Sequence, residues 1–419
     1  MTTLAAGQSG RTAVGFDVAR VRADFPSLSE LVHGKPLVYL DSANTSQKPA
    51  AVIQATDDYY RHANANIHRA THLLSERATA LYEGARRKAA AFLNAGDDHT
   101  IVLTKGTTDG INLVASSYGR SVLQAGDEIL LTWLEHHSNI VPWQLIAEQT
   151  GAAIRVVPIN DAGELDQDAY AALLSERTKI VAVGHVSNAL GTINPVKAMI
   201  AQAHAVGAVV LIDGAQAAPH LPIDVKDLDC DFYVLSSHKV FGPTGTGVLY
   251  GRRALLDAMP PYQGGGDMIA NVTFEKTLYN QIPYKFEAGT PNIAGVAGFG
   301  AAIDYLMGID RDAALAHEDD VLAYATARVR EIPGVRIIGE ARHKTGVLSF
   351  VMEGVHPHDA GTILDQQGIA VRTGQHCAQP VMDKFCIPAT IRASLAIYNN
   401  REDIDALVRG LLKVQEVFS

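Results

Sequence analysis

The sequence predicts an α/β protein: a mostly parallel sheet of seven strands with helices on both faces, followed by a smaller α+β domain. Two observations predict the sheet. Short apolar runs recur between residues 100 and 250, and helical patterns separate several of them. Strands that alternate with helices form parallel sheets that are covered on both faces. The predicted strands are Thr100–Leu103, Glu128–Leu131, Ile154–Pro158, Lys179–Val183, Ala208–Ile212, Phe232–Leu235 and Gly247–Tyr250.

Helical periodicity occupies several of the segments around these strands. Pro195 can open a helix because its fixed φ suits the first helical turn, and Gly207 marks the place where that helix stops. Another predicted helix has apolar residues at helical spacing, which indicates one buried face. The residues expected on that face are Leu81, Ala85, Ala89 and Phe92.

The pattern changes after about residue 305, and this change is the third observation behind the fold class. Helical stretches come first and strand-like runs follow, as in α+β domains. We therefore expect an N-terminal segment 1–35 packing with the small domain, a large domain 36–305 and a small domain 306–419. The elements expected near and within the last part are the helices Ala301–Met307, Asp320–Ile332 and Ile404–Val417 and the strands Val335–Ile338, Gly346–Val351 and Ile369–Arg372.

Composition and charge exclude several classes of protein. Hydrophobic residues make up 47% of the 419 residues and charged residues 19%, a profile that supports a large core and excludes disorder as the main state. The chain has 35 basic and 45 acidic residues, and this net charge of −10 argues against nucleic acid or an anionic membrane as a partner. No run approaches 18 apolar residues, so we expect no membrane span.

Three cysteines, Cys230, Cys377 and Cys386, are too few for a disulfide framework. Because the first residues also lack a secretory signal, we expect a reducing, cytoplasmic location. No C-x-x-C pair occurs, which argues against structural zinc. The neighbours His136 and His137 could bind a metal, but no acids or cysteines cluster with them at ligand spacing, and we expect no metal.

Polar residues follow three predicted strands at the ends where open α/β sheets bind ligands. Asp213 comes directly after Ala208–Ile212, and Lys239 comes soon after Phe232–Leu235. A strand-end Asp can also be an ordinary helix N-cap, and a strand-end Lys can simply be exposed. A desolvated lysine, however, can form a Schiff base with an aldehyde.

The third strand end is the segment Gly106-Thr107-Thr108-Asp109-Gly110, between the first predicted strand and a helical pattern. Backbone N–H groups and hydroxyls at a helix N-terminus bind phosphate well. An ordinary threonine N-cap would leave the same pattern, so this segment alone supports both interpretations.

Together, the three strand ends supply what pyridoxal 5′-phosphate requires. Lys239 offers an amine to the aldehyde of the cofactor, and Asp213 keeps the pyridine nitrogen protonated so that the ring can act as an electron sink. His136, which follows Glu128–Leu131, is placed by chain order to cover the ring. The residues that can hold the phosphate are Thr108, Ser236 and His238.

Short segments in a fixed order, from Val21-Arg22-Ala23-Asp24-Phe25-Pro26 to the last helix, make the chain resemble a cysteine desulfurase of the SUF type. This is a group within the fold-type I, class V aminotransferase-like enzymes. With so many matches in the same order, a chance resemblance is very improbable. The segments are Tyr39-Leu40-Asp41-Ser42-Ala43, Glu135-His136-His137, His185-Val186-Ser187-Asn188, Asp213-Gly214-Ala215-Gln216, His238-Lys239, Phe286-Glu287-Ala288-Gly289-Thr290-Pro291, Arg372-Thr373-Gly374-Gln375-His376-Cys377-Ala378 and Arg392-Ala393-Ser394.

The resemblance implies a fold-type I enzyme whose large domain binds pyridoxal 5′-phosphate and whose small domain carries the active-site cysteine loop. It implies that Lys239 is the Schiff-base lysine, that Asp213 pairs with the pyridine nitrogen, and that His136 stacks on the ring and assists proton transfer. The other implied residues are Gln216 at the ring hydroxyl, Thr107, Thr108, Ser236 and His238 around the phosphate, Thr290 from the partner subunit of a homodimer, Asn188 at the cofactor and, with Arg392, at the substrate carboxylate, and Arg372 at the mouth of the substrate site.

Cys377 decides the reaction class. A free cysteine is usually a small buried hydrophobe, but the flanks of Cys377 are loop-like and cationic, which favours a thiolate. The resemblance implies that L-cysteine becomes L-alanine while Cys377 takes the sulfur as a persulfide. The sulfur would then pass to a SUF-type acceptor protein, for iron–sulfur cluster assembly. Cys230 and Cys386 are interpreted as structural.

Three alternatives stay open. A selenocysteine lyase acting on L-selenocysteine would use the same cofactor and much of the same site. A class V lyase or transaminase that needs no cysteine would keep its activity in a Cys377→Ser variant. A non-catalytic scaffold is disfavoured because the lysine, aspartate, histidine and cysteine are all present. The sequence departs from the family at Ser237, where Gly is more frequent, and at Asn44-Thr45, which replace smaller residues.

Overall fold

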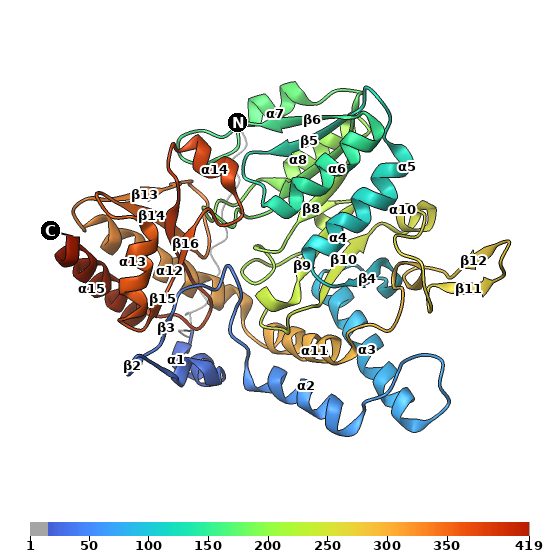
Figure 1. Ribbon diagram of the computed structural model, residues 1–419, viewed down its shortest axis with the longest axis horizontal. Helices are drawn as coiled ribbons and strands as arrows, with labels where there is room; N and C mark the ends of the chain where they lie inside the picture. Colours follow the sequence, from blue (N-terminus) through green and yellow to red (C-terminus); the bar gives the residue numbers. More distant parts are fainter. Residues whose placement is uncertain (1–15, 419) are drawn as a thin grey trace, which may run out of the picture.

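The computed structural model describes residues 16–418, which form two unequal bodies side by side (Figure 1). The expected loose stretch at residues 1–15 lies outside the described residues. The larger body is built on a seven-stranded sheet in the order β4-β10-β9-β8-β7-β5-β6, and each predicted strand is present in it. Its strands are β4 (Ile101–Thr104), β5 (Glu128–Thr132), β6 (Ala153–Val157), β7 (Thr178–Gly184), β8 (Val209–Asp213), β9 (Phe232–Ser236) and β10 (Gly247–Gly251).

The prediction of a mostly parallel sheet is confirmed. The pairs β5–β6, β5–β7, β7–β8 and β8–β9 are parallel, whereas β10 runs antiparallel to both β9 and β4. The carboxyl ends of β8 and β9 therefore lie at the same edge of the sheet. Each parallel crossover needs a helix or a long loop to return the chain, which explains the alternating pattern of the sequence.

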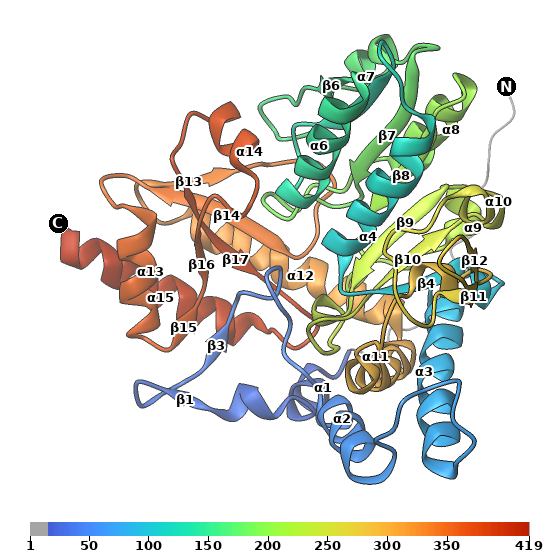
Figure 2. The same ribbon diagram turned by 45° about the vertical axis from the view of Figure 1, so that its right-hand side comes forward.

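Helices cover both faces of the sheet (Figure 2). Phe232 and Val234 of β9 belong to one apolar cluster, and the alternate residues Tyr233 and Leu235 belong to another, as a strand buried on both sides requires. The first cluster includes residues of α4 (Thr107–Val114), α6 (Val141–Thr150) and α10 (Arg253–Ala258). The second includes residues of α2 (Ala50–His62), α3 (Leu73–Phe92), α7 (Gln167–Leu173), α8 (Val196–Ala205) and α11 (Ile293–Met307).

The helix predicted between Pro195 and Gly207 is confirmed as α8. Pro195 is its N-cap, and Gly207 follows its end with φ of +80°. The predicted face of α3 is partly wrong. Ala85 and Ala89 are buried as expected, but Leu81 is 42% exposed and Tyr82 is buried in its place. A polar partner decides this rotation, since the Tyr82 hydroxyl donates to Glu287 in the core.

The smaller body is a four-stranded antiparallel sheet in the order β13-β14-β17-β16 with helices packed on it. The predicted run Ile369–Arg372 is in fact divided between two short strands, because β15 pairs with the N-terminal strand β3 while β16 pairs with β17. The elements are α12 (Arg311–Arg330), β13 (Val335–Ile338), β14 (Val347–Met352), α13 (Pro357–Asp365), β15 (Ile369–Ala370), β16 (Arg372–Gly374), α14 (Gln379–Lys384), β17 (Thr390–Ser394) and α15 (Arg401–Phe418).

The first part of the described chain, residues 16–62, contacts both bodies. Strand β3 (Val38–Tyr39) pairs with β15, and Arg22 forms an ion pair with Asp403 at 3.0 Å, whereas α2 packs on α11. Helices α11 and α12 meet at a bend of 84° beside the boundary predicted at residue 305, although the domain limits themselves stay a prediction. The remaining elements are α1 (Val18–Ala23), β1 (Leu31–Val32), β2 (Lys35–Pro36), α5 (Arg120–Val122), α9 (Val225–Leu228), β11 (Ile269–Val272) and β12 (Thr277–Tyr279), with short helical turns η1 (Pro26–Ser29), η2 (Asp98–Thr100), η3 (Ala115–Gly119), η4 (His137–Asn139), η5 (Ser237–Lys239) and η6 (Tyr284–Phe286).

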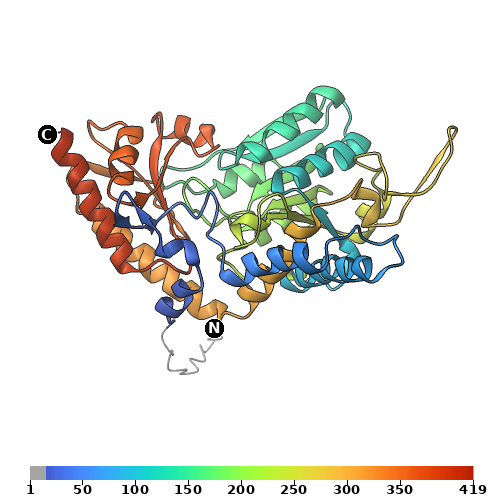
Figure 3. The same ribbon diagram turned by 60° about the horizontal axis from the view of Figure 1, so that its bottom comes forward.

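A hairpin formed by β11 and β12 projects from the large body, visible as the yellow-orange arm in Figure 3. Its apolar side chains are exposed, among them Phe274, Leu278 and Tyr279. Among residues 16–418, no single helix has both the length and the apolar composition to cross a membrane. Helices α11 and α12 meet these two criteria only when they are counted together, and the pair is sharply bent.

Candidate active site

Every site residue predicted from the sequence, with the exception of Thr290, lines one cavity of about 400 Å³. The cavity lies where the carboxyl ends of β8 and β9 face β16, β17 and the loop that follows β16. The predicted residues that line it are Thr107, Thr108, His136, Asn188, Asp213, Gln216, Ser236, His238, Lys239, Arg372, Cys377 and Arg392.

Lys239 and Asp213 come to this cavity from neighbouring strand ends. Burial lowers the pKa of Lys239 to about 8, although the negative charge of Asp213 acts in the opposite direction. Burial also raises the pKa of Asp213, whose Oδ1 accepts a hydrogen bond from the N–H of Ala215 at 2.9 Å. Within residues 16–418, the amine of Lys239 makes no hydrogen bond. A lysine with this depressed pKa has a substantial neutral fraction near pH 7 to 8 and can act as a nucleophile or a base.

The N-terminus of α4 forms a second wall with hydrogen-bond donors. The N–H of Thr107 donates to Ser236 Oγ at 2.8 Å, and that hydroxyl donates to Thr107 Oγ1 at 2.9 Å. Gly106 has φ of +146°, and a side chain at Gly247 would collide with it, so two glycines allow the strand and the helix start to touch. Such a helix start, with nearby hydroxyls, is suited to a phosphate group.

His136 is held as a neutral imidazole beside these groups. Its Nδ1 accepts a hydrogen bond from the N–H of Ser138 at 3.0 Å, which places the ring proton on Nε2. Burial, with the charge of Lys239, lowers the pKa of His136 to about 3. The adjacent Glu135 is buried and accepts the N–H of Gly184 at 2.9 Å, and burial raises the pKa of this carboxyl to about 7.

Arg392 is a buried cation on β17 at the opposite wall of the cavity. Its Nη1 donates to the carbonyl oxygen of Asn188 at 2.8 Å, its Nη2 lies 3.4 Å from Asp41, and its Nε is buried without a partner among the described residues. Burial lowers the pKa of Arg392 to about 10, so the guanidinium keeps its charge at neutral pH. Arg372 Nε lies 3.5 Å from the other oxygen of Asp41 and is nearer to solvent. The two arginines favour an anionic ligand, and the incomplete bonding of Arg392 leaves room for one.

The loop that carries Cys377 is tied to the large body by three hydrogen bonds. The N–H of His137 donates to the carbonyl oxygen of Cys377 at 2.7 Å, and Asn188 Nδ2 donates to that of His376 at 2.6 Å. The ring of His137 accepts the N–H of Gln379 at 3.2 Å. His376 and Cys377 both have left-handed backbones, with φ of +55° and +53°. This bend leaves Cys377 exposed at the cavity, where its thiol can meet both a bound ligand and solvent.

The other two cysteines differ from each other. Cys230 is buried, and burial raises its pKa to about 12, in agreement with an inert structural thiol. Cys386 was expected to be structural as well, but it is exposed. It follows α14 with φ of +53°, outside the cavity that Cys377 lines.

An N-terminal strap, residues 44–48, also reaches the site. In the sequence it was noted only because Asn44-Thr45 differ from the residues usual in the family. Thr45 Oγ1 and Ser46 Oγ donate to the carbonyl oxygen of His238 at 3.2 and 3.1 Å, and Lys48 Nζ donates to the same oxygen at 3.0 Å. This oxygen immediately precedes Lys239, so the strap positions the lysine. Asn44 lines the cavity itself.

Several groups near the cavity were missed by sequence reasoning as site residues: Asp41, Glu135, His137, Ser138, Lys48 and His376. The resemblance included some of them in its segments but gave them no role. Glu135, His137 and Ser138 lie within two residues of the predicted ring-covering histidine, which was their only local signal, whereas Asp41 and Lys48 reach the site from the N-terminal part of the chain. Ser237, where the sequence differs from the family, is fully buried. Gly242 has no side chain and so leaves space for the Ser237 hydroxyl.

Thr290 lies at the surface and does not line the cavity of its own chain. Its predicted role was a contact with the cofactor of a partner subunit, and that role stays a prediction.

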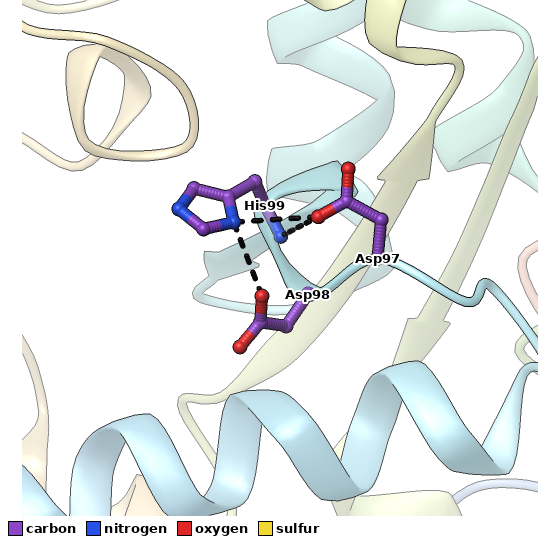
Figure 4. Close-up of side chains that lie close together, drawn as sticks. All are labelled: Asp97, Asp98 and His99. Carbon is purple, nitrogen blue, oxygen red and sulfur yellow. Dashed lines mark hydrogen bonds and ion pairs between the residues drawn. The ribbon is translucent and has the colours of Figure 1, made fainter.

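Metal binding was not expected. Within the described residues, one surface group has side chains of the ligating type: His99 Nδ1 lies near a carboxylate oxygen of both Asp97 and Asp98 (Figure 4). Asp97 is also bonded to Arg253, so this group is an ordinary charge network.

The residues present fit pyridoxal 5′-phosphate. Gln216 Oε1 is buried at the cavity without a hydrogen-bond partner among the described residues, and the Lys239 amine is equally unengaged. A buried unpaired amide oxygen is costly, which indicates that a ligand normally completes the site. The amine, carboxylate, amide and helix start that line this one cavity are the kinds of group that the aldehyde, pyridine nitrogen, ring hydroxyl and phosphate of the cofactor need.

Comparisons with known proteins agree with this geometry. The family model described as Aminotransferase class-V matches residues 38–407. A cysteine desulfurase of Pectobacterium atrosepticum is 50% identical over 406 residues, which is 96% of this chain and 99% of that protein. A cysteine desulfurase of Synechococcus elongatus is 53% identical over 98% of this chain, although the chain spans only 65% of that longer protein.

A solved structure shares the same fold. The crystal structure of the cysteine desulfurase CsdA from Escherichia coli superposes with a TM-score of 0.90, at 44% identity, over 96% of this chain and 100% of that one. The fold-type I architecture expected from the sequence is therefore confirmed. The chain belongs to the class-V aminotransferase family, and the three relatives described above are named cysteine desulfurases.

Proposed function

We propose that this protein is a pyridoxal 5′-phosphate-dependent cysteine desulfurase, which converts L-cysteine to L-alanine and holds the sulfur as a persulfide on Cys377. One observation carries the proposal. An exposed thiol on a bent loop lines the same cavity as a half-buried lysine whose pKa is lowered to about 8 by desolvation. A transaminase needs the lysine but has no use for the thiol.

The chain offers one residue or group for each part of the cofactor. Lys239 would hold the aldehyde, Asp213 the pyridine nitrogen and Gln216 the ring hydroxyl, while His136 would lie over the ring. When bound, the cofactor supplies an electron sink for the carbanion that forms at the substrate Cα. The phosphate would be held by the start of α4 and by Thr107, Thr108, Ser236 and His238.

Arg392 orients the substrate by binding its carboxylate, and Asn188 and Arg372 line the same wall. Once its amine is neutral, Lys239 takes the Cα proton of the substrate. The Cys377 thiolate then attacks the substrate sulfur: a new S–S bond forms as the C–S bond breaks, and its electron pair goes to the carbon skeleton. The carbon skeleton takes up one proton at Cβ, balanced by the proton that Cys377 released on becoming a thiolate, regains at Cα the proton held by Lys239, and leaves as alanine. The neutral His136, whose Nε2 carries a proton, is placed to assist proton transfer.

The persulfide on Cys377 is then passed to an acceptor protein of the SUF type, in the service of iron–sulfur cluster assembly. Exposure of Cys377 supports direct transfer, because an acceptor thiol can approach from solvent. We further propose a homodimer in a reducing, cytoplasmic setting. The exposed apolar arm at Phe274 and the location of Thr290 outside its own cavity support a partner subunit, which sedimentation analysis would detect.

The decisive experiment measures alanine formed from L-cysteine with added reductant. Wild type is compared with Cys377→Ser and with Cys386→Ser, a matched control because both cysteines are exposed and have φ of +53°. We expect Cys386→Ser to match wild type and Cys377→Ser to make no alanine while it still binds the cofactor. Equal alanine from all three proteins would reject the persulfide mechanism and leave cysteine-independent lyase chemistry.

A second candidate function is selenocysteine lyase, because the same residues would serve a selenium substrate. Relative rates on L-cysteine and L-selenocysteine distinguish the two. Activity of Cys377→Ser on L-selenocysteine alone would favour the lyase, since selenium leaves carbon without the attack of an enzyme thiol.

A further inference from the structure

A buried carboxylate next to His136 has no part in the mechanism described so far. Glu135 lines the cavity, and only 1% of it is exposed. Its Oε1 accepts a hydrogen bond from the hydroxyl of Thr132 at 2.6 Å. Its Oε2 accepts from Asn139 Nδ2 at 2.6 Å and from the N–H of Gly184 at 2.9 Å, and that N–H also lies 3.1 Å from Oε1. This one side chain therefore joins the end of β5, the turn η4 and the end of β7.

The orientation of the Asn139 amide is fixed from its other end. Its Oδ1 accepts the indole N–H of Trp143 at 2.9 Å, and an indole can only donate. Nδ2 of Asn139 must therefore face Glu135. Asn139 and Trp143 are completely buried, so a loss of the acceptor on Glu135 would leave the amide group unpaired away from water.

The acceptor that Glu135 offers at Oε2 does not depend on the charge of the carboxyl group. When Glu135 is protonated, Oε1 can carry the proton and donate it to the Thr132 hydroxyl, because a hydroxyl both donates and accepts. Oε2 then still accepts from Asn139 and Gly184. A glutamine with its NH₂ group in the place of Oε1 would keep the same two contacts. The anchor therefore requires an acceptor oxygen at the right distance and no particular charge.

The turn that Glu135 anchors also holds His136. The carbonyl oxygen of His136 accepts the N–H of Asn139 at 2.8 Å, and its Nδ1 accepts the N–H of Ser138 at 3.0 Å. Both donors belong to η4. The position of the imidazole therefore follows the position of this turn, and Glu135 fixes the turn to the sheet.

We propose that Glu135 is a positioning residue that keeps the imidazole of His136 in the place from which it covers the cofactor ring and assists proton transfer. The proposal rests on the function proposed above. Glu135 acts through the turn, because its oxygens are already engaged by Thr132, Asn139 and Gly184. A catalytic group that is displaced by about 1 Å can cost about 100-fold in rate, so the anchor matters although it lies behind the reacting atoms.

The test compares two variants of Glu135 in the holoenzyme. Glu135→Ala removes the acceptor, and we expect kcat for alanine formation to fall about 10- to 100-fold. Glu135→Gln keeps an acceptor for Asn139 and Gly184, and we expect its kcat to stay within about threefold of wild type. The visible circular dichroism of the bound cofactor, recorded without substrate, should change in Glu135→Ala and match wild type in Glu135→Gln.

Glu128 provides a matched control on the same strand. It is 3% exposed and lies at the other end of β5, where its Oε1 pairs with Arg155 and Arg177, each at 3.1 Å. It lies outside the cavity lining. Glu128→Ala also removes a buried carboxylate, so we expect lower stability with the kcat and the circular dichroism of wild type. A merely structural role of Glu135 would make the two alanine variants alike.

A double-mutant cycle shows whether Glu135 acts through His136. In a His136→Ala background, Glu135→Ala should lower kcat by no more than about twofold and leave the circular dichroism of the cofactor unchanged. If Glu135→Ala does not fold, Asn139→Leu, which removes the same hydrogen bond from its other end, takes its place with the same expectation. An undiminished loss in the His136→Ala background, or wild-type kcat without the anchor, would overturn the inference and leave the proposed function intact. If wild type itself made no alanine from L-cysteine, the proposed function would fail instead.

Discussion

The two walls of the cavity are built in opposite ways. The cofactor wall consists of strand ends and the start of α4, where Asp213 and Ser236 are buried and hydrogen-bonded to the backbone or to a neighbouring side chain. The cysteine wall is a loop with left-handed backbone at His376 and Cys377, and its thiol is exposed. The difference indicates that the two walls have separate functions. One wall holds a group permanently, and the other carries sulfur to solvent.

The largest expected effect concerns the cofactor wall. Lys239→Ala removes both the amine that holds the aldehyde and the base for the Cα proton, so alanine formation should fall by about 10³-fold or more. Lys344→Met is a matched control, because burial also lowers the pKa of Lys344 to about 8 while this residue lies outside the cavity. A Lys239→Ala protein that kept a tenth of wild-type activity would contradict the role of Lys239 on the cofactor wall.

Arg392 tests the substrate side of the cysteine wall. A lysine at this position keeps the charge but loses the planar fork, so Arg392→Lys should raise KM for L-cysteine by about 10- to 100-fold, with a smaller change in kcat. Steady-state kinetics measures both constants. Arg372→Lys should have less effect, since 43% of the Arg372 side chain is exposed and its ion pair is screened. Equal effects at the two positions would contradict the buried-clamp role of Arg392.

The pH dependence of cofactor uptake sharpens the description of the cofactor wall. Only the neutral amine of Lys239 attacks the aldehyde, and burial lowers its pKa to about 8. The protonated form therefore dominates below pH 8, and the rate of uptake by apoprotein should rise about tenfold per pH unit there and level off above it. Stopped-flow absorbance provides the rate. A rise that continues to the ordinary lysine pKa near 10.4 would show that the amine is not desolvated.

The smallest expected effect concerns the attachment of the cysteine loop. His137→Ala removes the acceptor for the N–H of Gln379, one neutral hydrogen bond, so alanine formation should fall by about 2- to 10-fold. The absorbance of the bound cofactor should not change, because that wall is untouched. His137→Asn offers an acceptor oxygen and should restore part of the rate. A loss as large as that of Lys239→Ala would show that the loop is not an independent unit.

Prediction from the sequence succeeded where the signal is local. Each strand of the main sheet could be predicted because a buried strand is a short apolar run, and α8 because proline and glycine mark its ends. It failed where a distant residue decides the outcome. Leu81 has the spacing of a core residue, yet Tyr82 takes that place through Glu287, and one apolar run became β15 and β16 because β3 pairs with only part of it.

The candidate site divides in the same way. Asp213, Lys239 and Thr107 could be identified because strand ends and helix starts have signatures within a few residues. The sequence could not show that residues 44–48 bond the carbonyl oxygen before Lys239, that Asp41 lies between two arginines, or that Cys386 is exposed.

By itself, the sequence determined the strand order along the chain, the reactive groups and the family they belong to, since periodicity and residue chemistry are properties of short segments. The tertiary structure alone decided which side chains complete the shell around those groups. Glu318 illustrates the reason: its partner His220 lies 98 residues away, and only the packing of α12 against the turn after β8 brings the carboxylate and the imidazole together in a site closed to water.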